Sequence, residues 1–245
     1  MRIVVDFQTD KLPIAYRMPV LSIIKESLRK GDKNIYERYF DSSTHLPKPY
    51  ASAVYLQNFQ IGEPDITLTG FRLHFTTDEY SILLPLLNGL QRTSTFTYKH
   101  YVFKRGKVQF EAEYQTSSNK VIVSTLSPIL IEDENGQPVA PSDPQYNRHF
   151  NEISNRLSQS LREKPLRKPV TITPLSTKKR VIKEANEEFL QSRDSDVQYL
   201  YFTAYSGRFL LEGDPSDIQW MLDVGVGLRR GQSFGMLVPE MEVKM

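Results

Sequence analysis

The stretch Gly225-Val-Gly-Leu-Arg-Arg-Gly-Gln-Ser-Phe-Gly235 decides how this chain is interpreted. It combines four glycines with two adjacent arginines. Glycine adopts positive φ and lets a ligand approach the backbone amides closely, and arginine adds a planar, fork-shaped charge. The stretch therefore predicts a loop that holds phosphate groups.

The segments on either side define the setting of this loop. Asp214 is a good N-cap, Pro215 fits the first turn of a helix, and Asp217 takes the capping-box position. We therefore expect a helix that ends in the first glycine of the loop. Nucleotide-binding P-loops and dinucleotide fingerprints need a strand before their glycines, so both motifs are excluded. Residues 234–238 are predicted to form a strand that Pro239 breaks.

Composition excludes several classes of protein and site. The 245 residues contain no run of about 20 apolar residues, and the N-terminus is charged too early for a signal peptide. We therefore expect a soluble cytoplasmic protein without a membrane partner. The absence of cysteine excludes disulfides, thiolate metal sites and cysteine nucleophiles. The four histidines lack paired spacing and no cofactor motif occurs, so no metal and no cofactor is predicted.

The order of the predicted elements repeats once along the chain. Residues 1–119 read strand, helix, strands, helix, strands, and residues 120–245 read strand, helix, strands, helix, strand. This order is typical of the ferredoxin-like unit. The sequence therefore predicts an α+β fold with two tandem ferredoxin-like (RRM-like) domains, divided between residues 119 and 120.

Two local features of the first half depend on glycine. Within the strand predicted over residues 65–75, Gly70 shifts the alternation of apolar residues, so a β-bulge is expected there. Residues 95–103 and 107–114 are predicted to pair as a hairpin around Arg105-Gly106.

Positive charge gathers in the second half. The net charge is only +2, so a nucleic acid would have to be held by local patches. Residues 148–183 contain ten lysines and arginines against two acids, and the run Lys178-Lys179-Arg180 is the densest part. A solvated helix face and linker is the alternative interpretation.

The glycine-rich loop resembles the hallmark of the CRISPR repeat-cleaving endoribonucleases of the repeat-associated mysterious protein (RAMP) superfamily. That hallmark is Gly-apolar-Gly, five residues that include Lys or Arg, and a second Gly-apolar-Gly. Gly225-Val226-Gly227 and Phe234-Gly235 match it, with Arg229 and Arg230 between them. Ser233 replaces the third glycine of the pattern.

The resemblance extends beyond the loop and implies a function. Residues 205–215 resemble the strand and helix start that precede the loop in the family, and residues 127–131 resemble its mid-chain strand. The family implies two ferredoxin-like domains side by side with RNA along their shared face. It also implies a metal-independent endoribonuclease that cleaves CRISPR repeat RNA in precursor transcripts to give mature guide RNAs. By the family's mechanism the 2′-hydroxyl attacks the adjacent phosphate and leaves a 2′,3′-cyclic phosphate.

His45 is the candidate acid or base for this reaction, because histidine titrates nearest neutrality. It lies in an irregular polar segment, with Lys48 three residues later and Tyr36 nine residues earlier. Many family members carry a catalytic histidine before a strand that begins with proline and an aromatic residue, which Pro49-Tyr50 matches. Some archaeal members use a tyrosine, a histidine and a lysine together, and Tyr36, His45 and Lys48 supply that set. A surface histidine without a role is the alternative.

The remaining candidates are expected to bind RNA. The predicted RNA-binding residues are Gly225, Gly227, Arg229, Arg230, Gly235, Lys178, Lys179 and Arg180. The expected partners are precursor and mature CRISPR RNA and other subunits of a CRISPR interference complex. The sequence leaves open whether the chain forms a homodimer.

Two other functions fit the same fold. A noncatalytic repeat-RNA-binding subunit of an interference complex would bind RNA and cut nothing. A metabolic enzyme on a ferredoxin-like scaffold would need a cofactor motif, which the sequence lacks.

Overall fold

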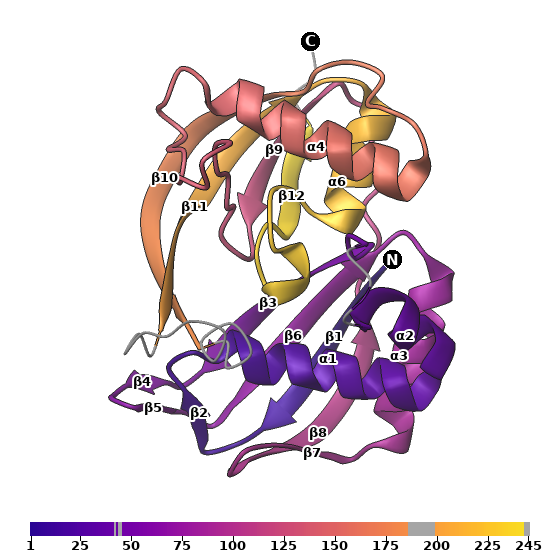
Figure 1. The fold of residues 1–245 in the computed structure, drawn as a ribbon, viewed down its shortest axis with the longest axis vertical. Helices are drawn as coiled ribbons and strands as arrows, with labels where there is room; N and C mark the ends of the chain where they lie inside the picture. Colours follow the sequence, from indigo (N-terminus) through magenta and orange to yellow (C-terminus); the bar gives the residue numbers. More distant parts are fainter. Residues whose placement is uncertain (42, 44–45, 186–198, 243–245) are drawn as a thin grey trace.

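The structure is a computed structural model that describes residues 1–41, 43, 46–185 and 199–242. Two sheet-and-helix halves lie one above the other in Figure 1, with the N-terminal half below. Within the described residues, no helix combines the length and apolarity needed to cross a membrane.

The first half is built on a five-stranded antiparallel sheet with the order β3-β6-β1-β8-β7. Its strands are β1 (Arg2–Gln8), β3 (Tyr50–Gln57), β6 (Gly70–Thr77), β7 (Thr95–Tyr98) and β8 (Tyr101–Phe110). Its helices are α1 (Arg17–Gly31), α2 (Lys33–Phe40) and α3 (Tyr80–Arg92). A small sheet of β2 (Lys11–Pro13), β5 (Asp65–Thr67) and β4 (Gln60–Ile61) lies at one end. Alternate residues of β1, among them Ile3, Val5 and Phe7, are buried in the core of this half.

The second half repeats this arrangement with a four-stranded antiparallel sheet of order β10-β11-β9-β12. Its strands are β9 (Lys120–Thr125), β10 (Thr171–Glu184), β11 (Leu200–Glu212) and β12 (Leu237–Glu242). Its helices are α4 (Tyr146–Arg162), α6 (Pro215–Val224) and the short 3-10 helix η1 (Arg230–Gln232). In the first half β1 pairs with β6 and β8, and in the second half β9 pairs with β11 and β12. The first strand of each half thus lies between two later strands, as in the ferredoxin-like unit. The prediction of an α+β chain with tandem ferredoxin-like folds is confirmed.

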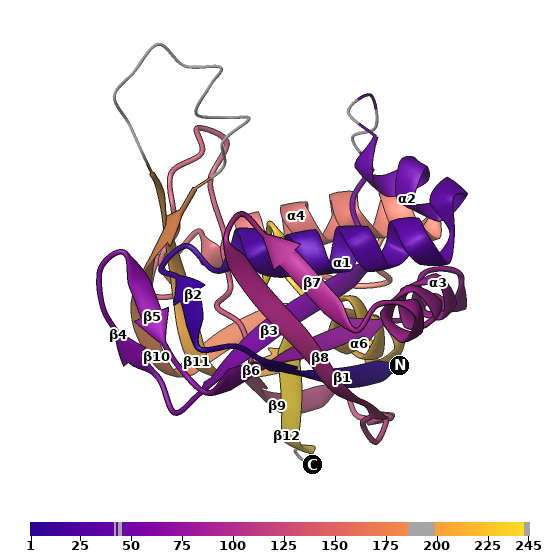
Figure 2. The same cartoon turned by 90° about the horizontal axis from the view of Figure 1, so that it is seen from below.

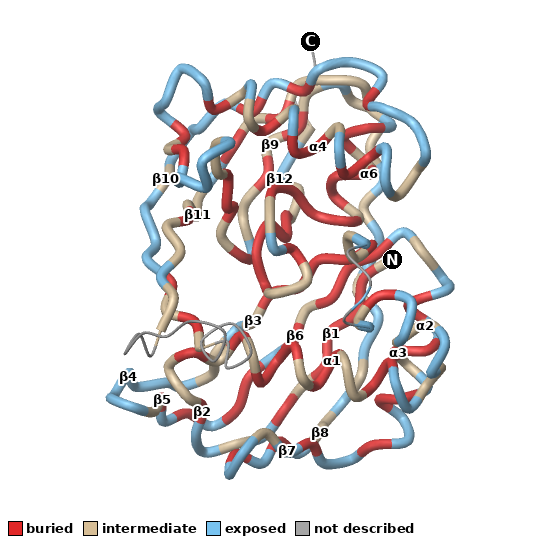
Figure 3. Tube along the Cα trace, viewed as in Figure 1, coloured by how far each residue is buried: buried red, intermediate tan, exposed pale blue. Residues whose placement is uncertain are grey.

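Each half has its own core, and the two cores meet beside β3. One core draws on residues 3–103 and the other on residues 121–237, and Figure 3 shows both as separate buried stretches. The expected division between residues 119 and 120 falls immediately before β9. Ala51 and Ala53 of β3 pack against Met236 from the second half. This contact brings β3 next to the glycine-rich loop.

Hydrogen bonds to backbone carbonyls also join the halves. The guanidinium of Arg2 donates to the carbonyl oxygens of Leu222 (2.9 Å) and Leu237 (2.7 Å) across the interface. The hydroxyl of Thr76 donates to the carbonyl of Asp223 at 2.9 Å. Buried polar groups of this kind must be paired, so these bonds fix how the halves sit relative to each other.

Three local predictions differ from the structure. Gly70 (φ 157°) is the first residue of β6, and the chain is interrupted between β5 and β6, which lie in different sheets. A complete break thus replaces the expected bulge. The predicted hairpin turn at Arg105-Gly106 is wrong, because β8 continues through both residues and pairs with β7 around Lys99 (φ 52°). Pro239 lies inside β12, where a shift of register against β9 accommodates it.

Helix α6 begins as predicted, but Asp217 has another role. The carboxylate of Asp214 accepts a hydrogen bond from the Ser216 amide at 2.9 Å. Asp217 is fully buried and accepts hydrogen bonds from the Arg162 guanidinium (2.7 Å) and the Arg167 amide (2.6 Å). The start of α6 is therefore tied to the end of α4, which places the loop that follows α6.

Candidate functional site

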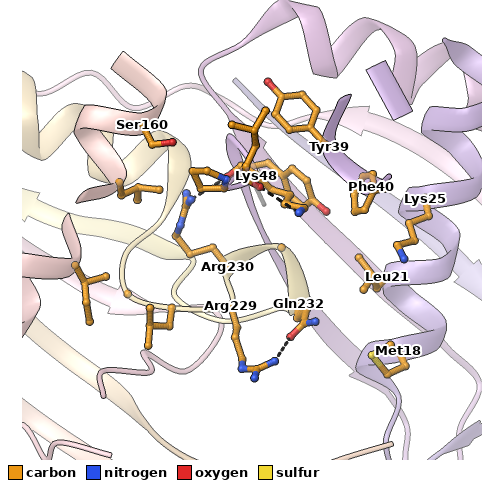
Figure 4. A pocket seen from close by; sticks show the side chains of 18 of the residues that line it. Met18, Leu21, Lys25, Tyr39, Phe40, Lys48, Ser160, Arg229, Arg230 and Gln232 are labelled. Atoms are coloured by element: carbon orange, nitrogen blue, oxygen red, sulfur yellow. Dashed lines mark hydrogen bonds between the residues drawn. The ribbon is translucent and has the colours of Figure 1, made fainter. Parts of the chain in front are cut away.

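A cleft of about 910 Å³ lies between the two halves. The first half contributes α1, α2 and residues 46–50, and the second half contributes α4 and residues 227–232 of the glycine-rich loop. Figure 4 shows the side chains that line it. Residues from both ends of the chain therefore meet in one cavity.

The glycines of the loop face protein atoms. Gly225, Gly227 and Gly235 all have positive φ, between 66° and 79°. A Cβ atom at Gly225 would lie 2.5 Å from the Cβ of Ala51, and one at Gly235 would lie 1.8 Å from the carbonyl oxygen of Val226. The sequence suggested that a phosphate approaches these positions, whereas in the structure the loop folds closely on itself and on β3.

The two adjacent arginines have different surroundings. Arg229 adopts the left-handed conformation and is exposed; its guanidinium donates to Gln232 Oε1 at 3.0 Å and lies over the Phe202 ring at 4.1 Å. Arg230 is only 5% exposed. Its guanidinium donates to the carbonyl oxygens of Val224 (2.5 Å) and Lys48 (2.8 Å). Arg229 is therefore available to a ligand, whereas Arg230 is engaged with protein, contrary to the RNA contact expected from the sequence.

The candidate catalytic segment borders the same cleft. His45 lies outside the described residues, but Leu46, Pro47 and Lys48 directly after it line the cavity. Lys48 Nζ donates to the Leu46 carbonyl at 3.2 Å and lies over the Phe40 ring at 5.3 Å. The structure thus brings Lys48 to the loop that carries Arg229.

Lys48 is made a readier proton donor by its setting. Burial, and then the charge of Lys25, lower its pKa below the usual value for lysine. Lys25 also lies near Phe40, with Nζ at 5.4 Å from the ring centre. Two ammonium groups therefore flank one aromatic ring at the cleft wall.

Tyr36 is not among the residues that line the cleft. Its ring stacks on Phe40 with the two centres 5.7 Å apart. Tyr36 therefore contacts a residue of the cleft wall without lining the cleft itself. Tyr39, one residue before Phe40, does line the cleft, and its hydroxyl donates to Glu79 at 3.4 Å.

The run Lys178-Lys179-Arg180 lies elsewhere, on β10. All three residues are exposed. Arg180 lines a second, smaller cleft of about 450 Å³ together with Tyr16 and Phe59. The basic run is therefore separated from the cavity that holds Lys48 and Arg229.

The sequence missed two cations of the larger cleft, Lys25 on α1 and Arg156 on α4. Arg156 is exposed between the buried residues Ile153 and Leu157 of the same helix. The helical spacing of the apolar residues of α4 does not show that this helix reaches the other half. Only the packing of the two halves shows which exposed side chains face each other.

The described residues contain no group of three or more His, Asp or Glu side chains that could hold a metal ion.

The sequence profile of the family described as CRISPR associated protein Cas6, C-terminal, matches residues 110–239, which is more than half of the chain. The chain belongs to the Cas6 family. The match includes the glycine-rich loop, and the resemblance seen in the sequence is confirmed.

Solved structures of Cas6 and RAMP proteins have the same fold. A Cas6-related protein from Pyrococcus furiosus superposes with a TM-score of 0.79 at 15% identity, over 99% of each chain. A structure described as a RAMP protein binding different RNA substrates has a TM-score of 0.78 at 17% identity, over 98% of this chain and 100% of that one. A Thermus thermophilus Cas6 in a product complex has a TM-score of 0.65 at 14% identity, over 98% of this chain and 99% of that one. Comparison with curated protein sequences finds no match.

Proposed function

We propose that this member of the Cas6 family is a metal-independent endoribonuclease that cuts CRISPR repeat RNA in precursor transcripts to release guide RNAs. One observation carries the proposal: Lys25 and Lys48 from one half and Arg156 and Arg229 from the other line a single cleft. A phosphate backbone is bound by such cations. The similar structures described as RNA-binding and as a product complex support the same substrate.

In this proposal the 2′-hydroxyl at the cut site attacks the neighbouring phosphorus, and the 5′-oxygen of the next nucleotide leaves. The products carry a 2′,3′-cyclic phosphate and a 5′-hydroxyl. His45 moves a proton as general base or acid. Lys48, whose pKa is lowered, donates a proton or a hydrogen bond at the leaving oxygen. Arg229 holds a phosphate oxygen.

Incubation with the repeat RNA of its own CRISPR array in excess EDTA tests the reaction. Intact protein is expected to give one cut per repeat, and the upstream product is expected to end in a cyclic phosphate. A 2′-deoxy nucleotide at the cut site should block cleavage without weakening binding, because only the attacking group is lost. RNA that is bound but remains whole would assign the protein to the noncatalytic RNA-binding class.

His45→Ala tests the assignment of the site. We expect the single-turnover rate to fall by about 10²- to 10⁴-fold, the usual contribution of a general acid or base. RNA affinity should change little. His149→Ala, on α4 but not among the residues that line the cleft, is the matched control and should cleave normally. Normal cleavage by His45→Ala would refute the assignment.

A further inference from the structure

Arg230 joins the two walls of the cleft at its base. One guanidinium nitrogen donates a hydrogen bond to the carbonyl oxygen of Val224, the last residue of α6. The other donates to the carbonyl oxygen of Lys48, two residues before β3. Figure 4 shows the side chain reaching from the glycine-rich loop to the chain at Lys48. Residues from the two halves therefore share one buried cation.

The rest of the loop also rests on the start of β3. A Cβ atom at Gly231 would lie 3.1 Å from the hydroxyl of Tyr50, whose ring is fully buried. The hydroxyls of Ser233 and Ser52 are 3.1 Å apart, and Arg17 Nε donates to the Ser233 carbonyl at 3.4 Å. The loop is thus held on both sides of Arg230, and little room is left for it to move independently of β3.

These contacts separate the two arginines by role. Because Arg230 is only 5% exposed, a phosphate could reach its guanidinium only if the loop moved away from Val224 or Lys48. Arg229, by contrast, can meet a ligand while its own contact to Gln232 persists.

We infer that Arg230 is a positioning residue, which holds the chain at Lys48 against the glycine-rich loop and thereby sets the distance from Lys48 to Arg229. The inference rests on the proposed function, because the placed groups are those of the cleavage reaction. A displacement of about 1 Å in such groups costs on the order of 100-fold in rate. Arg230 thus acts on the rate of the chemical step and makes no contact with a phosphate of the RNA.

The matched variants Arg230→Gln and Arg229→Gln separate the two roles. Arg229→Gln should weaken repeat-RNA binding and lower the slope of log Kd against log salt by about one, because one phosphate contact is lost. Arg230→Gln should keep the wild-type salt slope, and its single-turnover rate at saturating RNA should fall about 10- to 100-fold. Arg230→Lys, which can still donate to one carbonyl, should recover part of that rate.

Gly231→Ala displaces the loop without changing any charge. Its new methyl group would press on the buried ring of Tyr50, so we expect a rate lowered about threefold to tenfold, by the same positional argument, with an unchanged salt slope. Thermal unfolding of every variant shows whether it is folded. If Arg230→Gln does not fold, Arg230→Lys and Gly231→Ala decide the matter.

The outcomes distinguish this inference from the proposed function. A wild-type protein that leaves repeat RNA whole overturns both. If the wild-type protein cuts and Arg230→Gln cuts equally fast, only the positioning role is overturned. The same holds if the slope of log Kd against log salt falls by one in Arg230→Gln. Folded Arg230→Lys and Gly231→Ala variants that both cut at the wild-type rate overturn it as well.

Discussion

Glu184, at the end of β10, is a buried carboxylate with weak pairing. It is 5% exposed, its Oε1 lies 3.7 Å from Arg17 Nε, and neither oxygen accepts a hydrogen bond from the described residues. Burial raises its pKa from 4.5 to about 7, although the charges of Arg17 and Arg229 oppose the rise. Between pH 4.5 and 7 the folded state therefore binds more protons than the unfolded state, and stability falls as pH rises through this window.

Glu184→Gln should remove this pH dependence. Relative to wild type, the variant's free energy of unfolding is expected to gain up to about 3 kcal/mol between pH 5 and pH 8, at about 1.4 kcal/mol per pH unit. Urea denaturation at a series of pH values measures the change. The attraction to Arg17 acts on the ionised carboxylate and is already included in this pKa. Parallel curves for the two proteins would therefore contradict the raised pKa.

The neighbours Arg229 and Arg230 mark a limit of sequence reasoning at this scale. Both stand in a glycine-rich stretch, and nothing in the sequence separates them. Their directions diverge because Arg229 adopts φ 54° before a three-residue 3-10 turn that begins at Arg230. Backbone conformation at a single residue thus decides which arginine meets solvent, and composition and spacing do not encode it.

At the scale of elements, the glycine-rich loop should tolerate no side chain where it crosses itself. Gly235→Ala would place Cβ 1.8 Å from a backbone oxygen at φ 66°, so we expect a loss of about 2–5 kcal/mol. Gly136→Ala is the matched control, because it has φ 74° and nothing within 4 Å, and should lose only about 1–2 kcal/mol. Equal losses of unfolding free energy in the two variants, measured by chemical denaturation, would show that strain in φ explains the loss without the close contact at Gly235.

The elements with clear periodicity were the predictable ones. Helices α1, α4 and α6 occur where apolar residues recur at helical spacing, and the order of elements correctly indicated the tandem fold. The ends of strands in the first half could not be predicted as well from the sequence. A glycine there is compatible with a turn, a bulge or a close approach of two backbones. Gly106 approaches Asp6 on β1, where a Cβ atom would lie 3.2 Å away, and no local pattern reveals that contact.

For the whole molecule, Arg2 should matter more than its place in the first strand suggests. Arg2→Ala leaves the carbonyls of Leu222 and Leu237 without this donor, at about 1–3 kcal/mol each. We expect a lower unfolding midpoint, measured by calorimetry, and faster proteolysis between the halves. Arg72→Ala, which removes a half-exposed pair with Asp6 at 3.0 Å, should change stability by at most about 1 kcal/mol. Similar midpoints for the two variants would mean that Arg2 does not hold the halves together.

The β10–β11 hairpin links the two halves in a way that affects their motion. Residues 208–212 of β11 pair with β9, and Tyr205 forms a bridge with Ile129, so β10 and β11 form a two-stranded ribbon only beyond Tyr205. This ribbon extends beside the small sheet of the first half. There Lys183 lies 3.8 Å from Glu63. An isolated two-stranded ribbon is marginally stable in water, and this one is held by both halves. Its residues Ile182 and Ala204 are buried with Leu130 and Phe234 of the second half, and Lys183 contacts the first half. The rate of amide hydrogen exchange along residues 176–184 would then measure how often the ribbon detaches from this shared surface.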